Sequence, residues 1–130
     1  MMRLLFLTLF FLSRAVFSCP SGNGAEIVIR GTVSIETYPG PPNYESVKSG
    51  DRAEKYWFVT LAKSMCFDPD EQFMDSEVYI KKLQLLLFKM MGEVHLKAGE
   101  KYEFTGTTTP AITGHHRTKV MLEVSNIKAL

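Results

Sequence analysis

Two adjacent histidines, His115 and His116, have the clearest capacity for metal chemistry in this sequence. Imidazole nitrogens bind zinc or copper, and a carboxylate from Asp51 or Glu45 would supply a third ligand. Neighbouring side chains of an extended chain point in opposite directions, so the pair would chelate one ion only from a loop. The alternative is that one histidine hydrogen-bonds its own loop while the other lies in solvent. The sequence leaves both interpretations open.

The two histidines lie in one of two segments whose composition indicates loops. The first, residues 38–53, contains three prolines and a Gly50-Asp51 turn signal, and the second spans residues 109–118. Loops carry binding residues more often than strands do. The alternative is a rigid lid that packs Tyr38 and Tyr44 onto the domain. The candidate binding residues of the two loops are Tyr38, Pro41, Asn43, Tyr44, Glu45, Asp51, His115, His116 and Arg117.

The motifs that mark common enzymes are missing from the sequence. It contains no GxSxG, no HExxH and no glycine-rich phosphate loop. We therefore expect a protein that is not an enzyme.

Cys19 and Cys66 are the two cysteines of the chain. In an exported protein such a pair predicts a disulfide, and a crosslink over a loop of this length is worth roughly 4 kcal/mol. The alternative is a lipid anchor on Cys19, because residues 16–19 (VFSC) resemble a bacterial lipoprotein cleavage box, although Phe17 stands where such boxes carry a small residue. The anchor would leave Cys66 as a free thiol.

The N-terminal segment is typical of a secretory signal peptide. Residues 4–12 are apolar apart from Thr8, and Arg3 precedes them. A membrane-spanning helix needs about 20 apolar residues, so this run is too short to span a bilayer. Cleavage after Ser18 is preferred to cleavage after Ala15. The prediction is a signal peptide at 1–18 and a single exported domain at 19–130, located in the periplasm or secreted.

Alternation of apolar and polar residues predicts five strands at 26–38, 55–63, 77–87, 100–107 and 118–127, with a short helix or turn between the third and fourth. This order is that of an OB-fold, a small five-stranded Greek-key barrel. Trp57 shares one face of the second strand with its apolar neighbours, and Tyr56 and Phe58 share the other. The residues expected inside are Ile27, Ile29, Val33, Ile35, Tyr102, Phe104, Val120, Leu122 and Val124.

Composition and charge bound the size and the partners of the protein. The chain has 130 residues, of which 45% are hydrophobic, and 15 basic against 14 acidic side chains. This is enough for one globular domain. The near balance of charge argues against nucleic acid and anionic membrane surfaces as targets.

Three stretches together resemble a family of exported bacterial proteins of unknown function, the one numbered 4431. They are YPGPPNYESVKSGD with YWFVTL, then GEKYEFTG, then TGHHRTKVMLEV. The PGPPNYES and TGHH runs are the specific ones, and residues 88–98 depart from the short helix usual in the family. The resemblance implies export, the same barrel and a Cys19–Cys66 pair, and it implies no reaction.

The sequence thus favours an exported, non-enzymatic β-barrel that binds an unknown protein or small molecule through residues 38–53 and 109–118. One alternative is an inhibitor or immunity-type protein that blocks an enzyme of the cell envelope. Another is a metal-binding protein centred on His115 and His116.

Overall fold

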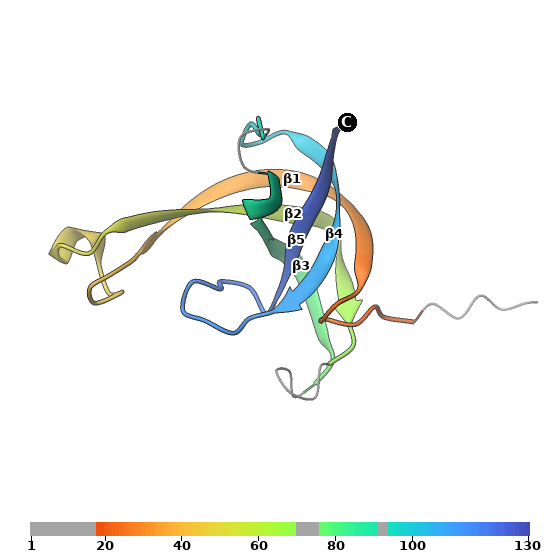
Figure 1. Ribbon diagram of the computed structural model, residues 1–130, viewed down its shortest axis with the longest axis horizontal. Helices are drawn as coiled ribbons and strands as arrows, with labels where there is room; N and C mark the ends of the chain where they lie inside the picture. Colours follow the sequence, from red (N-terminus) through yellow and green to blue (C-terminus); the bar gives the residue numbers. More distant parts are fainter. Residues whose placement is uncertain (1–17, 70–75, 91–93) are drawn as a thin grey trace, which may run out of the picture.

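The computed structural model describes residues 18–69, 76–90 and 94–130. Five strands form a closed barrel in the order β1-β2-β3-β5-β4 (Figure 1). All neighbouring pairs are antiparallel except β3 and β5, which are parallel. This topology confirms the predicted OB-like barrel. The strands are β1 (Glu26–Pro39), β2 (Ala53–Phe67), β3 (Val78–Leu86), β4 (Lys101–Pro110) and β5 (Val120–Ala129), and two 3-10 turns, η1 (Val47–Ser49) and η2 (Phe88–Met90), complete the elements.

The helix expected between the third and fourth strands is only the turn η2. Residues 1–17, which hold nearly all of the predicted signal peptide, lie outside the described residues. Within the described ranges, no helix is both long and apolar enough to cross a bilayer.

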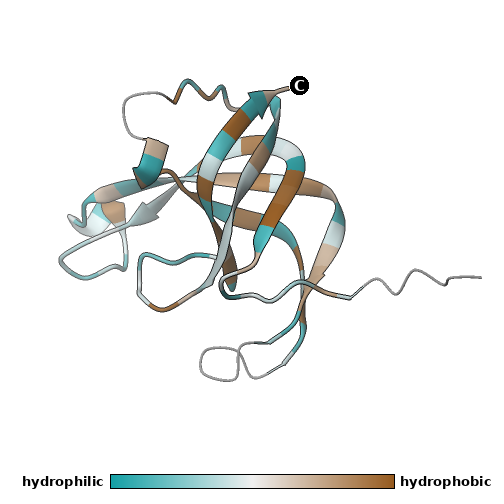
Figure 2. Cartoon of the chain, turned by 45° about the vertical axis from the view of Figure 1, so that its right-hand side comes forward, coloured by the Kyte–Doolittle hydropathy of each residue, from teal (hydrophilic) through white to brown (hydrophobic). Residues whose placement is uncertain are grey.

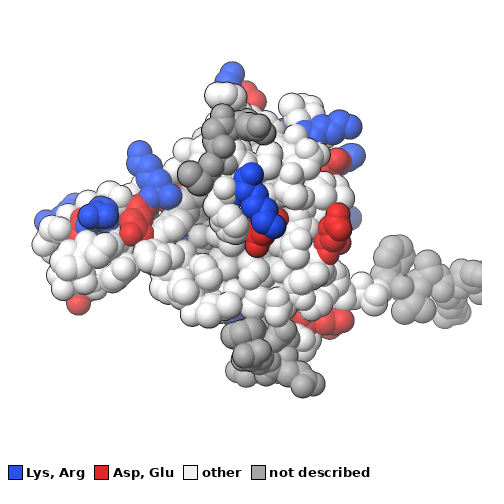
Figure 3. Space-filling model, viewed as in Figure 1, with Lys and Arg blue, Asp and Glu red and all other residues white. Residues whose placement is uncertain are grey.

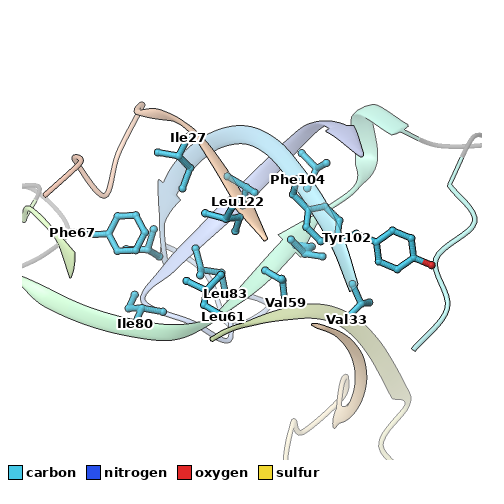
Figure 4. Close-up of a cluster of buried hydrophobic side chains, with 14 residues drawn as sticks. Ile27, Val33, Val59, Leu61, Phe67, Ile80, Leu83, Tyr102, Phe104 and Leu122 are labelled. Carbon is cyan, nitrogen blue, oxygen red and sulfur yellow. The ribbon is translucent and has the colours of Figure 1, made fainter. Parts of the chain in front are cut away.

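The interior of the barrel follows from the alternation of the strands. In β4 every second residue is buried, with Tyr102 and Phe104 inside as predicted. Bands of hydrophobic residues run along the barrel strands (Figure 2), and their side chains meet in one cluster (Figure 4). Phe67 closes this cluster beside the disulfide. The buried cluster comprises Ile27, Ile29, Val33, Val59, Leu61, Phe67, Ile80, Leu83, Leu85, Tyr102, Phe104, Val120, Leu122 and Val124.

Two glycines allow strands to pack closely in this barrel. At Gly31, β1 pairs with both β2 and β4, and a Cβ there would overlap the Thr60 carbonyl oxygen. At Gly106, a Cβ would overlap the carbonyl oxygen of Glu123 on β5. Both positions therefore require the absence of a side chain.

Cys19 and Cys66 form the predicted disulfide, with Cα atoms 5.3 Å apart. The second strand is longer than predicted, so Cys66 lies within β2 and pairs with Tyr79 instead of following the strand. The N-terminal segment is further held by the amide of Asp68, which donates to Pro20 O at 2.8 Å. A sulfur in this crosslink has no valence left for a lipid thioether, so the structure favours the disulfide over an anchor at Cys19.

Beyond the barrel, β1 and β2 continue as a two-stranded arm, residues 35–56, which projects to the left in Figure 1. β4 pairs with β1 no further than Thr32, and β3 pairs with β2 no further toward the arm than Trp57. The prediction that Ile35 points into the core is therefore wrong. Its side chain is 43% exposed because the strand has already left the barrel at this point.

Candidate binding site between the arm and the β4–β5 loop

Two outward-facing residues of β2 and β3, Phe58 and Gln84, are buried. Phe58 pairs with Ser34 on one side and with Gln84 on the other. Gln84 pairs in turn with Met121 of β5. Phe58 and Met121 are 0% exposed and Gln84 is 2% exposed. The segment that joins β4 to β5, residues 111–119 and here called the β4–β5 loop, is tied to this face.

Gln84 fixes that loop through three hydrogen bonds. Its backbone N–H donates to Thr118 Oγ1 at 2.9 Å, and its Nε2 donates to the carbonyl oxygen of His115 at 3.1 Å. Its Oε1 accepts from the backbone N–H of Arg117 at 2.6 Å. Sequence reasoning missed this residue. The signal was a glutamine standing alone in the apolar run LQLLL, where a buried polar side chain needs partners.

His116 holds the loop together from within. Its Nδ1 accepts from the backbone N–H groups of Ile112 at 2.8 Å and Thr113 at 3.2 Å. An acceptor nitrogen must be unprotonated, and burial, aided by the charge of neighbouring His115, lowers the His116 pKa below its ordinary value. This geometry gives His116 the structural role that the sequence left open.

Arg117 lies over two aromatic rings of the arm. Its Cζ is 4.4 Å from the ring centroid of Tyr38 and 5.4 Å from that of Tyr56. Its Nε and Nη2 are buried and have no hydrogen-bond partner among the described residues. The guanidinium therefore connects loop to arm through the ring faces, an arrangement that arginine suits better than lysine.

His115 joins the same loop to the arm through a polar cluster. Its Nδ1 lies 3.0 Å from Glu54 Oε2 and 3.1 Å from the Tyr56 hydroxyl, which itself donates to Glu54. The hydrogen bond from Tyr56 lowers the Glu54 pKa, helped by His115 and Arg117. Burial and the Glu54 carboxylate raise the Tyr56 pKa. At neutral pH the cluster thus holds an ionised Glu54 and a protonated Tyr56.

A second polar group lies over the ring of Phe58. Lys82 Nζ lies 4.8 Å from the centroid of that ring and donates to Glu36 Oε1 at 2.7 Å. The Tyr38 hydroxyl donates to the other oxygen of the same carboxylate at 2.8 Å. These two bonds, that from Lys82 first, lower the Glu36 pKa. Glu36, Lys82, Glu54 and Tyr56 were not among the predicted site residues, because each occupies an ordinary outward strand position.

At the tip of the arm, Asp51 organises the predicted loop. Its carboxylate is 4% exposed and accepts from the backbone N–H groups of Asn43 at 2.9 Å, Glu45 at 2.8 Å and Ser46 at 3.0 Å. These bonds, that from Ser46 first, lower the Asp51 pKa. The Pro41 carbonyl accepts from Arg52 N–H at 2.9 Å, which closes the turn. Asp51 is therefore a structural residue of the loop.

The predicted binding residues come together only in part. Tyr38, His115 and Arg117 meet at the face of the arm, and Tyr44 reaches them from the tip, its ring centroid 5.9 Å from that of His115. The side chain of Tyr44 is 46% exposed. Pro41 and Asn43 contribute backbone groups to the turn, and the described contacts of Glu45 are likewise through its backbone.

Among the described residues, no carboxylate or cysteine completes a group of three metal ligands with His115 and His116. The Nδ1 atoms of His115 and His116 are hydrogen-bonded to different groups, and the Asp51 carboxylate is occupied by backbone donors. Within the described ranges, the one group of three possible ligands is Cys19, Asp68 and Glu77, and Cys19 is in the disulfide.

Beside this assembly runs a groove of about 310 Å³. β2 forms one wall with Lys55, Tyr56 and Trp57, and the end of β3 with the start of η2 forms another. His115 and His116 close the third side. The groove is thus continuous with the contacts between arm and loop.

No protein family, curated protein or solved structure matches the chain. The resemblance to the family numbered 4431 therefore stays a prediction.

Proposed function

We propose that this protein is an exported, non-enzymatic binding module that holds its partner at the arm and the β4–β5 loop. The observation that supports this most directly is the prebuilt contact between the two loops, with Arg117 over Tyr38 and Tyr56 and with His115 against Glu54. In five-stranded barrels of this topology, the connections β1–β2 and β4–β5 border the usual ligand face. A surface held in place before binding loses less conformational entropy on association.

The protonation states of the cluster favour recognition over catalysis. A general acid or base works best with a pKa near the working pH. Here the Glu54 pKa is lowered and the Tyr56 pKa is raised, so both groups move away from neutrality. Acidic and basic side chains are also interspersed on the face shown in Figure 3, which suits a protein or small-molecule partner better than a polyanion.

Export is supported by the crosslink between Cys19 and Cys66, since such bonds persist outside the cytoplasm. The intact mass of the natively produced protein tests this part of the proposal. We expect a mature chain that begins at Cys19, contains the disulfide and carries no lipid. A mass that retains residues 1–18, or that includes a diacylglyceryl group, would contradict it.

Site-specific photocrosslinking tests the binding surface. A photoreactive benzoyl-phenylalanine at Ile112 of the β4–β5 loop is compared with the same group at Val28 on the barrel, because both side chains are 59% exposed. In the native compartment, we expect position 112 to crosslink to one predominant partner. Position 28 should not crosslink to that partner. Identical adducts at both positions, or none at 112, would refute binding at this surface.

The same adduct tests the alternative of an enzyme inhibitor. The tip of the arm favours that alternative to some degree, because Tyr44 is 46% and Val47 is 45% exposed on a turn that Asp51 braces. If the adduct is an envelope enzyme, the purified protein should inhibit it at a one-to-one ratio, and Tyr44→Ser should weaken that inhibition. An adduct whose activity is unaffected leaves the simpler binding module.

A further inference from the structure

The arm has a free backbone edge next to the groove. Gly40 N–H donates to Arg52 O at 2.6 Å, and β1 pairs with β2 residue by residue from there. Because bonding alternates along an antiparallel pair, Ala53 and Lys55 direct their N–H and C=O groups away from β1. β3 reaches β2 on that side only at Trp57, so no described strand pairs with the edge of Ala53 and Lys55.

The space beside this edge is the continuation of β3. β3 ends at Leu86 and the chain then turns into η2. The register of β3 would bring Leu87 opposite Lys55, but no backbone hydrogen bond joins these two described residues. An added strand would lie about 4.8 Å from β2. Its place coincides with the groove of about 310 Å³ that Lys55 and Tyr56 line on one side.

The walls of the groove provide contacts for side chains of such a strand. Leu86, Leu87 and Phe88 form an apolar wall, and Phe88 is 54% exposed. Trp57 also lines a neighbouring hollow of about 430 Å³. Unpaired backbone groups beside apolar walls are what strand addition requires, since the main chain gives affinity and alternate side chains fill pockets.

Charge indicates which side chains the added strand carries. Lys55 contributes a positive charge to the lining of the groove, and none of the described lining residues carries a carboxylate. Lys55 forms no ion pair with a described residue, whereas the nearby Glu54 is engaged by Tyr56 and His115. Acidic residues on the partner would therefore be complementary.

We propose that the edge of Ala53 and Lys55 receives an extended polypeptide segment, in which apolar residues alternate with Asp or Glu, as an additional strand in the groove. This inference rests on the proposed binding function and specifies the chemistry of the partner.

A pool of octapeptides that alternate Glu with Val, Leu or Phe tests the proposal on the mature, disulfide-bonded protein. We expect binding by isothermal titration calorimetry, about tenfold tighter than for the pool with Lys in place of Glu. Two forms of a bound peptide should then be compared, one N-methylated at its odd-numbered residues and the other at its even-numbered residues. One form should lose binding and the other should keep it, because only alternate amides of an added strand face β2. No binding in the millimolar range, or equal effects of the two methylation phases, would overturn the proposal.

Two variants locate the peptide on the edge. Lys55→Pro removes the outward N–H and retains the ladder to β1, so the barrel should stay folded and peptide affinity should fall by about tenfold or more. Lys55→Gln keeps the donor and removes the charge, so it should lose only the preference for Glu over Lys. Unchanged affinity in Lys55→Pro would contradict the proposed edge.

The outcomes distinguish strand addition at Ala53 and Lys55 from the proposed binding function. An adduct at Ile112 without peptide binding at the edge would leave the binding module and refute strand addition. Sedimentation that shows a dimer blocked by Lys55→Pro would identify a second copy of the chain as the occupant and would also refute it.

Discussion

The inside of the barrel and its covered outer face are both closely packed, but by different kinds of contact. Val33, Leu83 and Phe104 are 0% exposed among hydrophobic neighbours. Phe58 is equally buried on the outer face, yet Lys82 lies over it and Gln84 adjoins it. Apolar burial has no direction and no charge, whereas a polar cover depends on geometry and protonation. Gln84, Lys82 and the β4–β5 loop form this polar cover. It can therefore be altered while the barrel persists.

The strongest test of this contrast is a side chain at a glycine of each region. Gly106→Val should lower the free energy of unfolding by about 3 kcal/mol, because the new Cβ would overlap the Glu123 carbonyl oxygen. A Cβ at Gly114 of the β4–β5 loop would meet open space, so Gly114→Ala should change stability by less than about 0.5 kcal/mol. Urea denaturation measures the free energy of unfolding of both variants. Equal losses in the two would contradict the proposed difference between the barrel and its cover.

Loss of the disulfide should weaken the barrel without disturbing the site. Cys66→Ser together with Cys19→Ser should cost about 2–4 kcal/mol of unfolding free energy, because the unfolded chain gains freedom. The crosslink lies at the end of β2 opposite the arm, so the contacts of Arg117 should persist. Thermal unfolding with and without reductant gives the same comparison for the parent. An identical melting temperature in the two conditions would show that the crosslink contributes nothing.

The two regions also differ in how far the sequence predicts them. Alternation predicted the interior correctly where strands stay within the barrel, as at Tyr102 and Leu122. It failed at Ile35, because alternation defines a face and cannot show where a strand leaves the barrel. Phe58 was assigned to the correct face, but its burial there depends on a loop that is distant in sequence.

The same limit applies to the candidate site. The sequence pointed to His115, Arg117 and the proline-containing loop through their types and their positions between strands. It could not show that the Asp51 carboxylate accepts backbone N–H groups of its own turn. Glu54 was overlooked because only the register of β1 and β2, together with the path of the β4–β5 loop, brings it to His115.

A smaller effect than that of the disulfide should follow from replacing Gln84. Gln84→Leu keeps the side-chain volume but leaves His115 O and Arg117 N–H without their partner. We expect a loss of about 1–2 kcal/mol of unfolding free energy and faster amide exchange across residues 111–119. Leu83→Ala on the inner face should instead speed exchange throughout the barrel. Protection of the loop amides equal to that of the parent would mean that Gln84 does not hold the cover.

The smallest effect we predict is a pH dependence confined to the cover. The His116 pKa is depressed by burial, so its neutral form stabilises the folded loop fully above the ordinary value of 6.5. That contribution is lost as the pH falls from 6.5 toward the lower folded pKa, because Nδ1 then has to be protonated and can no longer accept from Ile112 and Thr113. Amide exchange at these two residues, corrected for its intrinsic pH dependence, should rise relative to that of Leu122 in the core.

His116→Asn tests whether the His116 imidazole causes this pH dependence. The asparagine Oδ1 accepts a hydrogen bond and does not titrate, so the loop should keep part of its protection and lose the pH dependence. A pH dependence of exchange at Ile112 and Thr113 that survives in His116→Asn would show that a group other than His116 causes it.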